Sequence, residues 1–129
     1  METLDGNFGP HLLAELRGCQ WDATQERNVR WFLESIVDVI GMKAIGKVHM
    51  DKYHGDKAWH GYSATIHIQT SHVTAHFFDE TGFVFLDIFS CRPFDVDHAR
   101  DHIVRVLQPN AHAWQLLQRG ALFPPEVVE

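Results

Sequence analysis

Three short segments with alternating apolar residues follow one another in the middle of the chain, at 62–68, 72–78 and 83–89. The connections between them, 69–71 and 79–82, are only three and four residues long. Parallel neighbours in a sheet need a crossover of a dozen or more residues, so these three segments can pair only as antiparallel strands. This constraint excludes a parallel α/β sheet for the centre of the fold.

The first of these segments has two chemically different sides. One side carries Tyr62, Ala64, Ile66 and Ile68, and the other carries Ser63, Thr65 and His67. Such alternation is typical of a strand that buries one face. The third segment is instead dense in apolar residues, as in a central strand buried on both faces, and we therefore expect its phenylalanines in the core. They are Phe83, Phe85 and Phe89.

The remaining elements flank this centre. A helix is predicted over 23–40, with Asp22 as its cap and apolar residues at helical spacing. A second helix begins at Asp95 or Asp97 and ends before Pro109. Further strands are predicted at 11–17, 44–50 and 111–117. The order β-α-β-β-β-β-α-β predicts one α+β domain over 1–129, a two-layer sandwich of an antiparallel sheet with two helices on one face.

Composition narrows the class of protein. The chain has 129 residues, 45% of them hydrophobic, which is enough for one core. Its net charge of -6 and the lack of a Lys/Arg run argue against nucleic-acid binding. No apolar run could span a membrane and the acidic start is no signal peptide, so we expect a cytoplasmic protein. In a reducing compartment Cys19 and Cys91 are expected as free thiols.

The central segments also hold most of the groups capable of chemistry. Ser71 lies between two predicted strands, His76 follows five residues later and Cys91 follows twenty residues later. A serine, a histidine and a thiol on neighbouring strands can form and use a reactive centre. If 62–68 and 72–78 form a hairpin, Ser63 would reach toward the partner strand. The ten histidines show no zinc-type spacing with the two cysteines, and we expect no metal site.

The same segments resemble the bacterial and archaeal S-adenosylmethionine decarboxylases. Residues 70–80 read Thr-Ser-His-Val-Thr-Ala-His-Phe-Phe-Asp-Glu, against the family's Glu-Ser-His-Leu-(Ser/Thr)-Ile-His-Thr-Trp-Pro-Glu. Residues 82–91 match the family's Gly-Tyr to Asp-(Leu/Val)-Phe-Thr-Cys stretch, with the same serine-to-cysteine spacing. The Asp-Val-Asp at 95–97 and the Gly-Pro-His-Leu at 9–12 also match. The resemblance covers roughly residues 9 to 118.

The resemblance implies a self-cleaving enzyme. Ser71 matches the serine that becomes a covalent pyruvoyl group, with cleavage between Thr70 and Ser71. His76 and Ser63 match residues that assist this processing, and Cys91 matches the proton donor in decarboxylation. The pyruvoyl ketone would form a Schiff base with the substrate amine and serve as the electron sink. For substrate binding, the resemblance points to Glu80 for the ribose and to Phe78 and Tyr53 as aromatic partners of the adenine.

Two departures keep alternatives open. Thr70 replaces the usual Glu, and Phe77-Phe78-Asp79 replaces Thr-Trp-Pro in the region of the substrate pocket. The first hypothesis is decarboxylation of the small molecule S-adenosylmethionine in spermidine biosynthesis. The second keeps the chemistry but moves it to arginine or ornithine. The third is an unprocessed homologue that binds a ligand or partner. By the same resemblance we expect a homodimer.

Overall fold

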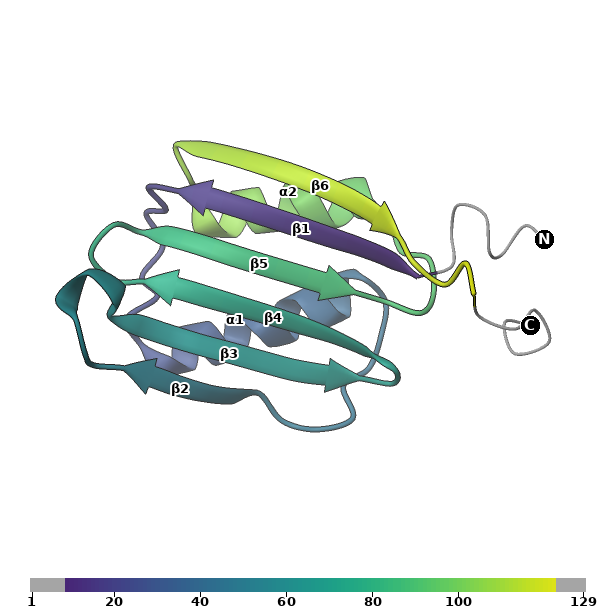
Figure 1. The fold of residues 1–129 in the computed structure, drawn as a ribbon, viewed down its shortest axis with the longest axis horizontal. Coiled ribbons are helices and arrows are strands. Elements are labelled where there is room, and N and C mark those ends of the chain that lie inside the picture. The colour runs from purple at the N-terminus through teal and green to yellow at the C-terminus, as the bar shows by residue number, and fades with distance from the viewer. Residues whose placement is uncertain (1–8, 123–129) are drawn as a thin grey trace.

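The computed structural model describes residues 9–122, which form one antiparallel sheet with two helices on one face (Figure 1). The strand order is β2-β3-β4-β5-β1-β6. The strands are β1 (Pro10–Arg17), β2 (His49–Tyr53), β3 (Gly61–Ile68), β4 (Ser71–Phe78), β5 (Phe83–Phe89) and β6 (Ala111–Gln118). The helices are α1 (Glu26–Val39), α2 (Val96–Leu107) and the short 3-10 helix η2 (Lys57–Trp59). The predicted two-layer α+β architecture is confirmed.

The two long helices start differently. The predicted start of the first helix at residue 23 is wrong, because the Asp22 carboxylate accepts the backbone N–H of Thr24 at 2.9 Å and closes a turn of its own. Helix α1 therefore begins at Glu26, and its capping position, Gln25, makes no side-chain cap. Helix α2 has the expected cap, since the Asp95 carboxylate accepts the backbone N–H of His98 at 3.0 Å.

The edge strand β2 lies later in the chain than predicted. A strand was expected at 44–50, but Ala44 makes only an isolated bridge to Ile68, and the ladder with β3 begins at His49. An edge strand pairs on one side only, and β2 alternates exposed His49, Asp51 and Tyr53 with half-buried residues. Its polar sequence therefore resembles a loop, whereas the apolar 44–48 resembles a strand.

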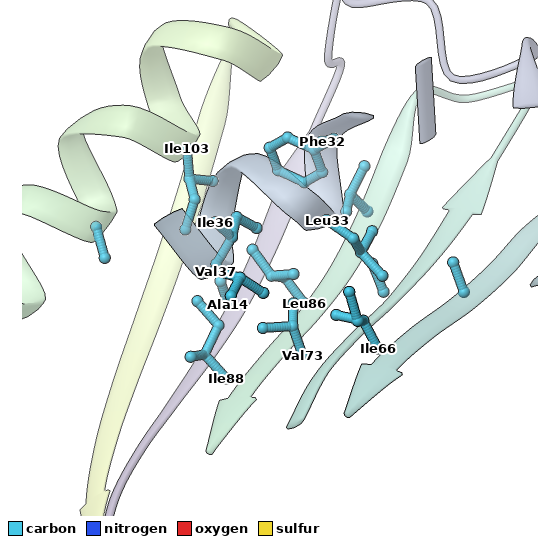
Figure 2. Packing of buried hydrophobic residues seen from close by; sticks show 14 of the residues in the cluster. Ala14, Phe32, Leu33, Ile36, Val37, Ile66, Val73, Leu86, Ile88 and Ile103 are labelled. Carbon is cyan, nitrogen blue, oxygen red and sulfur yellow. The ribbon is translucent and has the colours of Figure 1, made fainter. Parts of the chain in front are cut away.

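The core lies between the sheet and the helices. Figure 2 shows Phe32, Leu33 and Ile36 of α1 packed over side chains of the central strands. On the sheet these contacts come from Ile66, Val73, Leu86 and Ile88, and all of these side chains are almost fully buried. Side chains along a strand alternate between the two faces of the sheet, so every second residue of these strands points toward the helices. These residues pack the sheet against the helix layer.

Neither of the two long helices covers the opposite face of the sheet, which we call the open face (Figure 1). The register pairs Ser63 with His76, Thr65 with Thr74 and His67 with His72 across β3 and β4, and these side chains point to that face. The expectation that the phenylalanines of β5 lie in the core is wrong. Phe85 is 42% exposed, and Phe83 and Phe89 are only half-buried. Within 9–122 no helix has the length and apolar character needed to span a membrane.

Candidate active site

The two-residue turn between β3 and β4 holds an unusual backbone conformation. Ile68 pairs with Ser71, so Gln69 and Thr70 alone reverse the chain. Thr70 has a φ of 55°, in the left-handed region that a β-branched side chain rarely enters. Such a conformation costs about 1–2 kcal/mol. The peptide bond from Thr70 to Ser71 thus follows a strained residue.

Ser71, Thr70 and Cys91 come together at this turn. Ser71 is only 7% exposed. Its hydroxyl lies 3.3 Å from the Gln69 carbonyl, to which it can donate, and accepts the backbone N–H of Cys91 at 3.0 Å. The Cys91 thiol lies within hydrogen-bonding distance of the Thr70 hydroxyl and 3.7 Å from the Gln69 carbonyl. The predicted proximity of the serine and the thiol is therefore present in the single chain.

Ser63 and His76 form a separate pair on the open face. Their hydroxyl oxygen and ring Nδ1 are 2.7 Å apart, directly across the β3–β4 ladder. His76 lies five residues along β4 from Ser71, a distance of roughly 16 Å at the usual strand rise. An odd separation also puts the two side chains on opposite faces. The expectation that His76 comes together with Ser71 is therefore wrong within one chain, whereas Ser63 reaches the partner strand β4 as expected.

The three expected substrate-binding residues also lie at the far end of β4. Phe78 ends that strand, and its ring lies edge-on to Trp59 with centroids 5.8 Å apart. Glu80 follows in the turn and pairs with Lys57 at 3.5 Å. Tyr53 is half-exposed at the end of β2. These residues share the end of the sheet that holds Ser63 and His76, and not the end that holds Ser71.

Sequence reasoning missed a cluster of His11, His72 and Asp87 on the open face. The Asp87 carboxylate is hydrogen-bonded to His11 and lies 3.6 Å from His72 Nε2. The three potential ligand atoms lie within 4.8 Å of one another. However, Arg119 Nη1 is 3.4 Å from the other ring nitrogen of His11, and this positive charge disfavours a bound cation. Only the pairing of β1 with β5 brings His11 to residues 76 positions away, so spacing gave no signal.

Two concave regions flank this cluster. One, of about 490 Å³, is lined by His76, Thr74, Asp87 and Glu15 together with residues of β6. The other, of about 410 Å³, has Ser71 and Arg119 in its lining. The candidate reactive turn thus opens into a space that could hold a small molecule.

The two cysteines are free thiols in different environments. Burial raises the pKa of Cys19 to about 11, so this thiol stays protonated and unreactive at neutral pH. Cys19 therefore differs from Cys91, which lies beside the strained turn.

Comparison with known proteins identifies the family. Residues 10–120 match the family described as S-adenosylmethionine decarboxylase. This chain belongs to the S-adenosylmethionine decarboxylase family. Its relatives include the S-adenosylmethionine decarboxylase proenzymes of Bacillus velezensis and Archaeoglobus fulgidus. The first is 29% identical over 93% of this chain and 89% of its own length. The second is 31% identical over 87% of this chain and 97% of its own length.

A solved structure supports the same assignment. The adenosylmethionine decarboxylase of Aquifex aeolicus aligns with a TM-score of 0.72 and 25% sequence identity. The alignment covers 88% of this chain and 91% of that protein. The shared fold therefore extends over most of the chain, and not only over the turn before Ser71.

Proposed function

We propose that this protein is a self-processing, pyruvoyl-dependent decarboxylase of S-adenosylmethionine that acts in polyamine biosynthesis. The observation that carries the proposal is the turn at Thr70, whose strained backbone precedes a buried serine in hydrogen-bonding contact with Cys91. The name proenzyme of the relatives supports cleavage. The substrate in the name of the family supports the reaction.

Self-cleavage requires no reagent other than water. The Ser71 hydroxyl oxygen attacks the Thr70 carbonyl carbon, the peptide C–N bond breaks, and the hydroxyl proton passes to the freed amine. A base then removes the α-proton of Ser71, the Cβ–Oγ bond breaks, and Thr70 leaves as a carboxylate. Water adds to the resulting dehydroalanine and ammonia leaves, which yields the pyruvoyl group. Strain at Thr70 favours the first step, because breaking the peptide bond releases it.

The residues around Ser71 fit a pyruvoyl group at this position. Ser71 lies at a chain reversal, where the new ends can separate without disrupting a strand, and its environment excludes most water. The pyruvoyl group supplies a ketone that captures the substrate amine and accepts the electron pair left by carbon dioxide. Cys91 holds a thiol proton beside the same position, where it can protonate the substrate carbon after decarboxylation.

Ser63 and His76 require a second copy of the chain. They lie roughly 16 Å from Ser71 of their own chain, too far for hydrogen bonding. A two-fold axis between two open faces, running across the strands, would place the His76 end of one sheet opposite the Ser71 end of the other. The half-exposed ring of Phe85 on that face would be buried by such contact. We therefore propose a homodimer in which the partner's Ser63 and His76 assist cleavage.

The same arrangement gives the expected substrate-binding residues a role. Phe78, Glu80 and Tyr53 share an end with His76, so each would serve the site of the partner. The aromatic rings can stack with an adenine, and the Glu80 carboxylate can accept hydrogen bonds from ribose hydroxyls. Turnover assays with S-adenosylmethionine, arginine and ornithine would decide whether the substrate is a nucleoside or a basic amino acid.

Intact mass of the denatured protein tests the proposal. The wild-type chain of 14.8 kDa should yield two fragments, 1–70 and 71–129. The fragment 71–129 should carry a carbonyl group that reacts with hydrazines. The Ser71→Ala variant should remain whole. A wild-type chain that stays uncut after long incubation would contradict the proposal and favour a non-catalytic homologue.

A further inference from the structure

The cavity beside Ser71 has a distinct charge. Thr70, Ser71, His72, Phe89 and Arg119 contribute to its lining. The remaining lining residues are Ile45, His67 and Ile68, so among residues 9–122 no carboxylate lines this space. The neighbouring cavity, in contrast, includes the carboxylates of Glu15 and Asp87. The open face is thus polarised, with its cationic end at the reactive turn.

Arg119 supplies the permanent positive charge of the Ser71 cavity. Its guanidinium lies over the Phe89 ring, 4.3 Å from the ring centroid, and its backbone N–H donates to the Gly9 carbonyl at 2.9 Å. Among residues 9–122 the guanidinium makes one side-chain hydrogen bond, a long one of 3.4 Å to His11, and no carboxylate in that range pairs with it. A guanidinium has five N–H donors, so most of this fork remains available to a ligand.

The shape of the free fork defines the ligand. Two parallel N–H groups match the two oxygens of a carboxylate, and this bidentate pairing is stronger than a neutral hydrogen bond. The contact of the guanidinium with the Phe89 ring limits the rotamers that binding would otherwise have to restrict. A planar anion of two oxygens therefore fits this end of the cavity.

We propose that Arg119 binds the α-carboxylate of the substrate and so selects amino acids over amines. The inference rests on the proposed function, because the pyruvoyl group formed from Ser71 would hold the α-amine in the same cavity. The cationic remainder of the substrate would then extend away from Arg119. After carbon dioxide leaves, the product has no carboxylate, so the contact with Arg119 is lost and release of the product becomes easier.

Three variants test this assignment. Arg119→Met removes the charge while keeping an unbranched apolar side chain, and Arg119→Lys keeps the charge without the fork. Arg27→Met serves as the matched control, because Arg27 is exposed on α1 in the helix layer. Intact mass is measured first, and all three variants should cleave as the wild type does. The KM for S-adenosylmethionine should then rise roughly 10–100-fold in Arg119→Met, less in Arg119→Lys, and stay unchanged in Arg27→Met.

A binding measurement separates the carboxylate from the rest of the ligand. Calorimetry on the Ser71→Ala protein, with and without Arg119→Met, compares S-adenosylmethionine with the amine that remains after its decarboxylation. Arg119→Met should weaken binding of the amino acid and change binding of the amine less than about 2-fold. Equal losses for both ligands, or no loss for either, would overturn the assignment of Arg119.

The outcomes keep the two proposals apart. A wild-type chain that never cleaves contradicts the proposed function, while the calorimetric comparison still judges Arg119 on its own. If Ser71→Ala binds neither ligand, the carboxylate site is rejected. If Arg119→Met fails to cleave where the wild type cleaves, Arg119 acts in processing, and its assignment as a substrate-binding residue is wrong.

Discussion

The two faces of the same strands have different tasks. Along β4, Val73 and Phe77 are almost fully buried against the helices, whereas Thr74 and His76 alternate with them on the open face. The buried side chains pack the sheet against the helices. The side chains on the open face carry hydroxyls, imidazoles and aromatic rings, and neither long helix covers them. One strand therefore supplies stability with every second residue and leaves the others free for ligands or a second chain.

The sheet itself has two unlike ends. One end holds the strained turn, Ser71 and Arg119, and the other end holds the Ser63–His76 pair and Phe78. On the proposed mechanism, self-cleavage uses groups from both ends. The proposed homodimer would bring the two ends together, and four experiments test this comparison.

The largest expected effect is complementation between the two ends. His76→Ala alone should cleave very slowly, and Ser71→Ala should not cleave. When the two variants are mixed after unfolding and refolded together, the His76→Ala chain should cleave, because it keeps Ser71 and its partner supplies His76. Intact mass would show which chain is cut. Cleavage of His76→Ala that is equally slow alone and in the mixture would contradict a shared site.

A smaller effect separates the buried face from the open face. Phe77→Ala should lower the free energy of unfolding by about 3–5 kcal/mol, because it leaves a cavity in the core. Phe85→Ala, on the open face, should cost less than about 1 kcal/mol within one chain but should weaken dimerisation. Urea denaturation and sedimentation measure the two effects. A stable dimer of Phe85→Ala at micromolar concentration would count against contact through this face.

The two thiols should also differ in reactivity. Iodoacetamide at pH 7.5 should modify Cys91 well before Cys19, because burial raises the pKa of Cys19 to about 11 and leaves almost no thiolate. Peptide mass mapping over time measures the two rates, with Cys19→Ala as the control. Equal rates for the two cysteines would show that Cys19 is more accessible than the fold implies.

The smallest effect concerns the helix layer behind the sheet. Burial lowers the pKa of His102, whose Nε2 lies 2.8 Å from the Ser35 hydroxyl between α2 and α1. The unfolded chain then binds this proton more readily than the folded one, so stability present above pH 6.5 declines as the pH falls. His102→Gln should show a shallower decline of Tm between pH 7 and 5. The difference is expected to be modest, because the residue is partly solvated. An unchanged slope would exclude His102 as a contributor.

Sequence patterning predicted most of the fold and part of the site. Short connections required antiparallel neighbours, and β5 was located to the residue because a dense apolar run that follows a turn is a local signal. The turn before Ser71 and the contact with Cys91 followed from hairpin pairing and from family spacing. The polar edge strand β2 was misplaced, since a strand with one neighbour needs few apolar residues.

Local pattern alone determined that Ser63, Thr65 and His67 share one side of their strand. Only the tertiary structure decided what lies against that side. The apolar sequence around Phe85 predicts a core residue, yet the helices pack against the other face of the sheet and leave Phe85 exposed. Likewise Arg119 reaches Phe89 and the Ser71 cavity only because β1 joins β5 to β6. Strand alternation is encoded over a few residues, whereas the choice of which strands become neighbours depends on the burial of the whole sheet.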